Sequence, residues 1–197
     1  MPGYELDTRD PIELFGRWMG EAEGSEPNDP NAVALATATP DGAPSVRMVL
    51  LKHADAGGFW FFTNGESEKG RELAANPRAA MCFHWKTLRR QVRVVGRVSE
   101  LPGEEVDAYF HSRSRRSQVG AAVSDQSRPL ATREELEERV QRFGEEHPGE
   151  VPRPEYWKGY SLHAERIEFW VDGSDRLHDR FLFVMEHGAW MVQRLYP

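Results

Sequence analysis

The chain has 197 residues, a formal net charge of −7, a hydrophobic fraction of 39% and six Trp. A chain of this length can bury a core, and this composition argues against disorder. The acidic balance gives no support to general binding of nucleic acids or anionic membranes. The single Cys82 excludes an intrachain disulfide and a cysteine-based metal cluster, and the dispersed His residues give little support to any metal site.

Neither a signal peptide nor an apolar run long enough to cross a membrane is found along the sequence. We therefore expect a cytoplasmic protein. Its length suits a single domain over residues 1–197, in which residues 1–9 form a flexible tail.

Helix starts are marked by capping residues. Asp10 can cap a helix whose first position is Pro11, and Thr132 opens a capping box with Glu135. Ser67 is a plausible cap for another helix. The sequence therefore predicts helices from residue 11 to the loop at 24–30, from 68 to 76, from about 103, and from 133.

Apolar runs and alternating patterns predict the strands. Two of them, residues 32–39 and 44–52, are joined by Asp41-Gly42, which is a hairpin signal. The other predicted strands are residues 59–63, 78–85, 91–98, 160–171, 180–186 and 189–195. Short strands in mostly antiparallel order, with helices between them, indicate a mainly β (α+β) fold based on a β-barrel with peripheral helices. A doubly wound sheet is disfavoured, because no Gly-x-Gly-x-x-Gly motif follows a strand.

The strand that contains residues 47–52 has a cation at each end. Arg47 and Lys52 are five residues apart, so a regular strand would point them to opposite faces. The strand could then serve two anionic ligands, or one ligand and a solvated surface. A core strand with charged ends is the plainer alternative.

Three polar side chains follow one another at intervals of four residues: Tyr109, Arg113 and Ser117. On a continuous helix they would line one face and present a phenol, a guanidinium and a hydroxyl together. These groups are complementary donors for a phosphate monoester. On spacing alone, an ordinary amphipathic helix with an exposed Arg is the more frequent case.

Two further segments are possible anion sites. Ser67-Glu68-Lys69 stands at a helix start, where free N–H groups and the helix dipole favour phosphate, although most helix starts bind only water. The second segment is Arg176-Leu177-His178. It could hold a polar substrate, or it could be an exposed surface segment without a ligand.

Several motifs occur in a fixed order from about Asp10 to the end of the chain. They are Arg47-Met48-Val49-Leu50-Leu51-Lys52, Tyr109-Phe110-His111-Ser112-Arg113, Ser117-Gln118-Val119-Gly120, Ser124-Asp125-Gln126-Ser127, Ile167-Glu168-Phe169-Trp170, Arg176-Leu177-His178-Asp179-Arg180, and the terminal Trp190 with Arg194-Leu195-Tyr196-Pro197. In these motifs the chain resembles the pyridoxamine 5′-phosphate oxidase family. So many matches in one order are specific, whereas any one alone would not be.

The resemblance implies a split β-barrel of the FMN-binding type with peripheral helices, and a homodimer with FMN at the subunit interface. It also implies an activity: oxidation of pyridoxine 5′-phosphate or pyridoxamine 5′-phosphate to pyridoxal 5′-phosphate, with O₂ as acceptor and H₂O₂ as product. This reaction belongs to vitamin B6 synthesis and salvage.

The resemblance also implies which residues form the site. Those around FMN, partly from the other subunit, would be Arg47, Met48, Val49, Leu50, Lys52, Phe62, Thr63, Lys69, Gln91, Gln126, Ser127, Trp170 and Arg180. Those around the substrate would be Lys52, Tyr109, Arg113, Ser117, Arg176, Leu177 and His178. Lys69 would hold the FMN phosphate, while the catalytic pair, Arg176 and His178, would orient the substrate ring and stabilise charge.

Two positions depart from the family pattern. Glu68 stands where the family usually has Arg, and Ala122 stands where Trp is common. A carboxylate in the first turn of a helix favours the helix dipole, but it would repel an FMN phosphate. Either Glu68 points to solvent or Arg71 supplies the lost charge, and we expect the first.

Two other functions stay open. One is a related split-barrel flavin oxidase that acts on another ring, such as a dihydrophenazine. The retained Lys52, Tyr109, Arg113 and Ser117 argue against it, since a substrate without phosphate would not need them. The other is a non-catalytic protein that binds flavin or pyridoxal phosphate.

Overall fold

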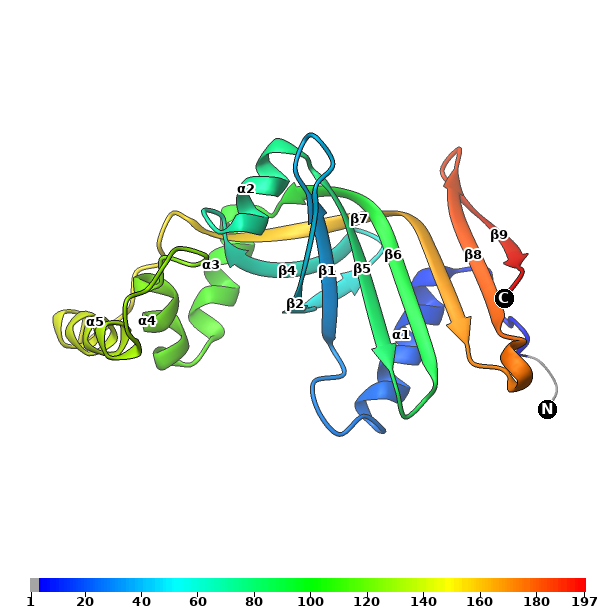
Figure 1. The fold of residues 1–197 in the computed structure, drawn as a ribbon, viewed down its shortest axis with the longest axis horizontal. Helices are drawn as coiled ribbons and strands as arrows, with labels where there is room; N and C mark the ends of the chain where they lie inside the picture. The colour runs from blue at the N-terminus through cyan, green and yellow to red at the C-terminus, as the bar shows by residue number, and fades with distance from the viewer. Residues whose placement is uncertain (1–3) are drawn as a thin grey trace.

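The computed structural model describes residues 4–197, in which an antiparallel sheet of nine strands is flanked by five α-helices (Figure 1). The strands are β1 (Ala32–Ala38), β2 (Pro44–Leu50), β3 (His53–Asp55), β4 (Gly58–Asn64), β5 (Arg78–Trp85), β6 (Arg90–Glu100), β7 (Trp157–Val171), β8 (Asp179–Glu186) and β9 (Ala189–Leu195). The strand order is β2-β1-β5-β6-β7-β4-β3, with β8 beside β7 and β9 beside β8. The expected mainly β fold with peripheral helices is confirmed.

The long strand β7 divides the sheet. It pairs with β6 along one edge, whereas on its other edge residues 157–162 pair with β4 and residues 166–171 pair with β8. A register shift between Val95 and Gly96 separates these two parts. A Cβ at Gly96 would lie 1.9 Å from the carbonyl oxygen of His163, so this close approach of two backbones requires glycine. The β8–β9 hairpin therefore stands apart from β4 and β3 (Figure 1).

Three helices start where the capping residues Asp10, Ser67 and Thr132 predict. The helices are α1 (Pro11–Glu23), α2 (Glu68–Ala75), α3 (Gly103–Ser112), α4 (Arg115–Val123) and α5 (Arg133–Glu146), with a 3₁₀ turn η1 (Ser174–Arg176). Asp10 accepts hydrogen bonds from the N–H groups of Ile12 and Glu13, and Thr132 accepts one from Glu135. The predicted starts of α1, α2, α3 and α5 are confirmed, whereas α4 was not predicted as a separate helix.

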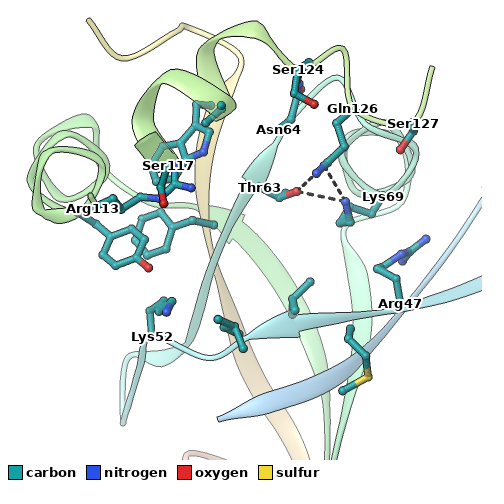
Figure 2. Close-up of a pocket in the computed structure, with 18 of the residues that line it drawn as sticks. Arg47, Lys52, Thr63, Asn64, Lys69, Arg113, Ser117, Ser124, Gln126 and Ser127 are labelled. Atoms are coloured by element: carbon teal, nitrogen blue, oxygen red, sulfur yellow. Dashed lines mark hydrogen bonds between the residues drawn. The ribbon is translucent and has the colours of Figure 1, made fainter. Parts of the chain in front are cut away.

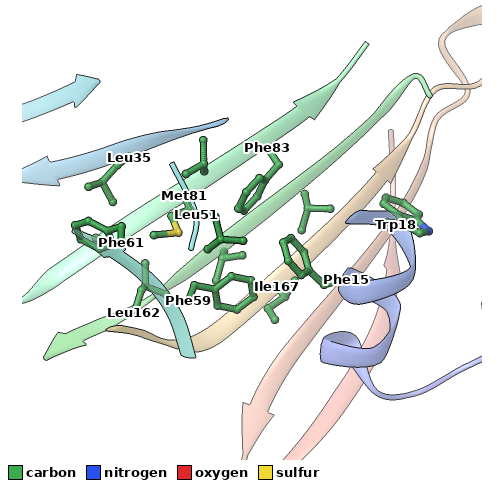
Figure 3. Packing of buried hydrophobic residues seen from close by; sticks show 14 of the residues in the cluster. Phe15, Trp18, Leu35, Leu51, Phe59, Phe61, Met81, Phe83, Leu162 and Ile167 are labelled. Carbon is green, nitrogen blue, oxygen red and sulfur yellow. The ribbon is translucent and has the colours of Figure 1, made fainter. Parts of the chain in front are cut away.

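The main core lies between the sheet and α1 (Figure 3). The apolar stripe of α1 brings Phe15 against Phe59 and Phe83, with ring centroids 4.9 and 5.1 Å apart. Trp18 packs edge-on against Phe169 at 5.0 Å. Phe15 is 2% exposed, so truncating it to Ala would cost about 3–5 kcal/mol of stability.

A second, smaller apolar cluster attaches α3 and α4 to the start of β7. Its buried members are Val106, Phe110, Val119, Val151 and Trp157. Because this cluster fixes α3 and α4 beside β4, it determines where the polar residues of those helices lie.

Some expectations need correction. The short strand β3 was not predicted, and β7 begins at Trp157 rather than at residue 160. That residues 1–9 form a flexible tail stays a prediction, and residues 1–3 lie outside the described part. Tyr4 is held in place: its N–H donates to Asp179 Oδ2 at 2.7 Å, and its ring packs edge-on against Trp18.

Within residues 4–197, none of the helices combines the length and the apolar character needed to cross a bilayer. The cytoplasmic location stays a prediction.

Candidate active site

A cavity of about 850 Å³ opens between β2, β4, α2 and the α3–α4 segment (Figure 2). Its cationic side chains lie at two ends. Arg47 and Lys69 lie at one end, which we call the α2 end; Lys52, Arg113 and Ser117 lie at the other, which we call the α4 end (Figure 2). The predicted site residues that line this cavity are Arg47, Met48, Val49, Leu50, Lys52, Phe62, Thr63, Lys69, Tyr109, Arg113, Ser117, Gln126 and Ser127.

At the α2 end, Arg47 is held by a buried carboxylate. Ser45 and Arg47 share one face of β2, and Ser45 lies opposite Thr37 of β1. Glu72 of α2, 8% exposed, accepts hydrogen bonds from Thr37 and Ser45 and lies 3.4 Å from Arg47 Nη2. Burial alone would raise the pKa of Glu72, but the bonds from Thr37 and Ser45 and the charge of Arg47 hold it below its ordinary value. Glu72 is therefore an ionised anchor for Arg47.

Lys69, in the first turn of α2, is also buried. Its Nζ donates to Gln126 Oε1 at 2.9 Å and to Thr63 Oγ1 at 3.2 Å (Figure 2). It also donates to Ser67 Oγ at 3.2 Å. Burial, and next the charge of Arg47, lower the pKa of Lys69. An anion placed between Arg47 and Lys69 would offset both effects, because its negative charge favours the charged form of Lys69.

Glu68 is mostly exposed, as expected: its side chain has 61% of its surface accessible. Its carboxylate nevertheless lines the cavity and lies 4.0 Å from Arg47 Nη2. Arg71 does not supply a compensating charge, because its guanidinium donates to the backbone carbonyl of Glu66. The α2 end therefore contains two cations and two carboxylates.

At the α4 end, Tyr109, Arg113 and Ser117 do not lie on one continuous helix, which was the condition for their spacing to place them on one face. The chain is extended at Arg113, with φ −74° and ψ 155°, and α4 starts anew with Ser114 as its cap. The side-chain amide of Gln118 donates to the carbonyl oxygens of His111 and Arg113, which have lost their helical partners.

The break creates a new helix N-terminus at the cavity wall, since its cap Ser114 lines the cavity. Although the helix is broken, Tyr109, Arg113 and Ser117 all line this cavity.

The cations of the α4 end have no acidic partner within residues 4–197. Lys52 Nζ lies 5.6 Å from the ring centroid of Tyr109. Arg113 Nη1 is buried and has no hydrogen-bond partner in this range, and burial lowers the pKa of the guanidinium. An unpaired buried donor costs free energy, which an incoming anion would recover.

Arg47 and Lys52 were expected on opposite faces of one strand, and this is wrong. The strand β2 ends at Leu50. The N–H of Lys52 instead donates to the carbonyl of Trp60 at 2.9 Å, so the chain has left β1 for β4. The alternation of a regular strand stops there, and both cations line one cavity.

The remaining predicted residues lie elsewhere in the chain. Trp170, Arg176 and His178 line a separate hollow of about 390 Å³. His178 Nδ1 is 3.1 Å from Asp172 Oδ1. The other predicted residues line neither of these two cavities and are Gln91, Leu177 and Arg180. One chain therefore does not bring the two groups of residues together.

Two family models match the chain. The model described as pyridoxamine 5′-phosphate oxidase matches residues 21–147, and that of the pyridoxine 5′-phosphate oxidase C-terminal dimerisation region matches residues 157–197. The chain belongs to the pyridoxamine 5′-phosphate oxidase family.

Similar proteins support this assignment. A pyridoxine/pyridoxamine 5′-phosphate oxidase of Rhodospirillum rubrum is 57% identical over 198 residues, covering 98% of each chain. One of Gluconobacter oxydans is 56% identical over 189 residues, covering 95% of this chain and 94% of the relative.

Among solved structures, PhzG from Burkholderia lata 383, in complex with tetrahydrophenazine-1-carboxylic acid, has a TM-score of 0.93 and 32% identity, covering 100% of this chain and 97% of that chain. A pyridoxamine 5′-phosphate oxidase-related, FMN binding protein from Nostoc punctiforme has a TM-score of 0.78 and 15% identity, covering 98% of this chain and all of that chain. The second shows the fold alone, and the expected split-barrel fold is confirmed.

Sequence reasoning missed several residues of this family member's site. Glu72 lies four residues after Glu68, so both could face Arg47 from one side of α2, but nothing in the sequence indicates which carboxylate is buried. Trp157 lines the cavity at the start of β7, and no local pattern distinguishes it from a core residue.

In residues 4–197, no group of three or more His, Cys, Asp or Glu side chains is arranged to hold a metal ion.

Proposed function

We propose that this protein is an FMN-dependent oxidase that converts pyridoxine 5′-phosphate or pyridoxamine 5′-phosphate to pyridoxal 5′-phosphate, with O₂ as acceptor and H₂O₂ as product. The observation that carries the proposal is a single cavity with two separate cationic ends, which suits two phosphate-bearing molecules side by side. The relatives that carry this activity in their names, at 56–57% identity, support the same assignment.

The α2 end fits the phosphate of FMN. Its buried Lys69 and its anchored Arg47 form a preorganised pair of cations, and a phosphate monoester would relieve the conditions that lower the pKa of Lys69. Met48, Leu50 and Phe62 supply apolar surface to the same cavity, as an isoalloxazine ring requires.

The α4 end fits the phosphate of the substrate. Lys52 and Arg113 offer two cations, and Ser117 adds a hydroxyl at the start of α4. These groups bind the substrate far from its reacting carbon, so their binding energy fixes the position of that carbon. When bound, the flavin supplies a two-electron acceptor for the hydride that leaves the substrate C4′. The Phe62 and Tyr109 rings stack on each other and supply apolar surface in this part of the cavity.

We further propose that a second copy of the chain completes the site. Gln91, Trp170, Arg176, His178 and Arg180 would then reach the cavity from the partner subunit, where Arg176 and His178 orient the substrate ring. The match of residues 157–197 to a dimerisation region supports this. So does the edge strand β2, whose Val46 and Met48 are 69% and 63% exposed in the single chain.

The test is an assay of H₂O₂ release by purified protein with each of the two phosphorylated vitamers. We expect a yellow protein that releases FMN rather than FAD on denaturation, and O₂-dependent H₂O₂ release with at least one vitamer. A colourless protein that takes up no added FMN would overturn the proposal. Sedimentation of the active holoprotein should show a dimer, and an active monomer would rule out the composite site.

A dihydrophenazine oxidase is the second candidate, because the PhzG structure that resembles this chain holds a tetrahydrophenazine-1-carboxylic acid. That compound contains no phosphate. Lys52 and Arg113 at the α4 end favour the phosphorylated vitamers over it. Release of H₂O₂ with a dihydrophenazine carboxylic acid, and none with either vitamer, would favour the second candidate.

A further inference from the structure

Arg113 is held in place by aromatic rings. Its Cζ lies 5.1 Å from the ring centroid of Trp157 and 6.0 Å from that of Phe110. Its guanidinium forms no ion pair within residues 4–197, and its buried Nη1 has no hydrogen-bond partner in this range. Arg113 is half-buried, and an arginine that is largely withdrawn from water is normally paired with a carboxylate, as Arg47 is with Glu72. Another interaction must therefore orient the Arg113 side chain.

Trp157 can provide that interaction because it is itself fixed. The residue is 5% exposed, and its ring stacks on Phe62 at 5.3 Å with an interplanar angle of 15°. Phe110 contacts it edge-on at 5.0 Å. Its carbonyl oxygen accepts a hydrogen bond from Arg153 Nη1 at 2.9 Å, at the point where β7 begins. The ring is therefore a rigid surface.

The same stack carries the second cation of the α4 end. Tyr109 stacks on Phe62 with ring centroids 4.1 Å apart and an interplanar angle of 25°. Lys52 Nζ lies 5.6 Å from the Tyr109 ring centroid. Both cations of this end thus lie over rings of one three-ring stack, formed by Phe62, Tyr109 and Trp157.

We propose that Trp157 is a positioning residue for substrate binding, whose ring orients the Arg113 guanidinium through cation–π attraction and leaves its N–H donors to the substrate phosphate. An aromatic face attracts a cation without accepting hydrogen bonds in the guanidinium plane. A carboxylate would take two of those N–H groups in a bidentate pair and compete with the phosphate. That the anion is a phosphate monoester rests on the proposed function.

A double-mutant cycle tests this role. We expect Trp157→Leu to raise KM for the preferred vitamer about 3- to 30-fold, the range of a partly buried cation–π contact. It should leave kcat within about twofold and FMN content unchanged. In an Arg113→Met background, which keeps the bulk of the side chain without its charge, Trp157→Leu should change KM by less than about twofold. Equal effects in the two backgrounds would overturn the proposal.

Trp157→Phe is the conservative variant. It also keeps the test possible if Trp157→Leu does not fold. It keeps an aromatic face of smaller cation affinity, so KM should rise less than in Trp157→Leu, again only when Arg113 is present. A residue that served packing alone would give the same change with Arg113 and with Met at that position, and would lower thermal stability in parallel with KM.

A binding measurement separates this inference from the proposed function. Inorganic phosphate, titrated into the holoprotein by calorimetry, should bind more weakly to Trp157→Phe than to the parent, and equally to both in the Arg113→Met background. If the parent oxidises neither vitamer but this pattern holds, the proposed function fails and the role of Trp157 stands. If the parent is active and phosphate binds the parent and Trp157→Phe equally, the role of Trp157 fails alone.

Discussion

The two ends of the cavity hold their cations in opposite ways. At the α2 end, Arg47 shares a network with the buried Glu72, and Lys69 donates to Gln126. At the α4 end, Lys52 and Arg113 lie over aromatic rings and have no carboxylate partner within residues 4–197. One end is charge-balanced when empty, and the other is not.

This difference suggests what each end is for. A paired buried cation is already satisfied, so the α2 end keeps its order without a ligand and suits a cofactor that stays bound. Arg113 is half-buried and its Nη1 has no hydrogen-bond partner within residues 4–197, so a phosphate that reaches it replaces no protein partner. The α4 end therefore suits a substrate that binds and leaves in every turnover.

Removing Glu72 should make the α2 end resemble the α4 end. Glu72→Ala leaves Arg47 without its partner, and we expect the apoprotein to lose about 3 kcal/mol of unfolding free energy, because breaking a buried ion pair leaves an unpaired charge. Glu72→Gln, which can still accept from Thr37 and Ser45, should lose less. Urea denaturation at one fixed protein concentration measures both.

Ligand dependence is the control for this prediction. Saturating FMN should restore part of the stability lost in Glu72→Ala, because the phosphate takes over the role of the carboxylate. The same loss with and without FMN would mean that Glu72 acts only in packing.

Removing the unpaired cation should affect catalysis and leave the cofactor in place. Arg113→Ala should lower kcat/KM for pyridoxine 5′-phosphate by about 30- to 150-fold, mainly through KM, since a charge-assisted contact contributes about 2–3 kcal/mol. FMN content, measured by absorbance, should not change. Loss of FMN with unaltered kinetics in the remaining holoprotein would assign Arg113 to the other ligand.

The sequence predicts what depends on neighbouring residues. Asp10, Ser67 and Thr132 mark helix starts because each side chain caps N–H groups two or three residues away. Strand β5 was predicted with its observed bounds, since its alternating side chains show the pleat directly.

What could not be predicted depends on residues far apart in the chain. The break at Arg113 is stabilised by Gln118, yet Ser112-Arg113-Ser114 is compatible with a continuing helix. Glu72 meets Thr37 and Ser45 only because α2 packs beside β1 and β2. Motif matching selected the cations of both ends without indicating that one end is paired and the other is not.

Acid should reduce the stability that the ionised Glu72 contributes at the α2 end. Burial alone would raise the pKa of Glu72, but its hydrogen bonds and the charge of Arg47 lower this pKa from its ordinary value of 4.5. A carboxyl whose folded-state pKa is lowered stabilises the fold above its unfolded value, and this stability is lost as the pH falls through the folded value. The stability difference between the parent apoprotein and Glu72→Gln should therefore narrow as the pH falls below 4.5. Urea midpoints taken from pH 7 to pH 3 check this, and a constant difference would contradict it.

Glu68 offers the smallest change, because its carboxylate is exposed and lies 4.0 Å from Arg47. At this position a negative charge opposes a bound phosphate, whereas Glu68→Arg would add a cation to the α2 end. Exposed charge pairs contribute about 0.2–1 kcal/mol, so we expect FMN to bind about 2- to 5-fold more tightly. Added salt should reduce this gain only slightly, because the second subunit that we propose would partly shield this contact from solvent.

Titration of the apoprotein with FMN, followed by fluorescence, measures this effect. Glu134→Arg is the matched control: it places the same change of charge in the first turn of α5, outside the cavity. Equal tightening in both variants would assign the gain to net charge. Weaker FMN binding by Glu68→Arg would mean that the new guanidinium displaces Arg47 from Glu72, and that the paired end tolerates no third cation.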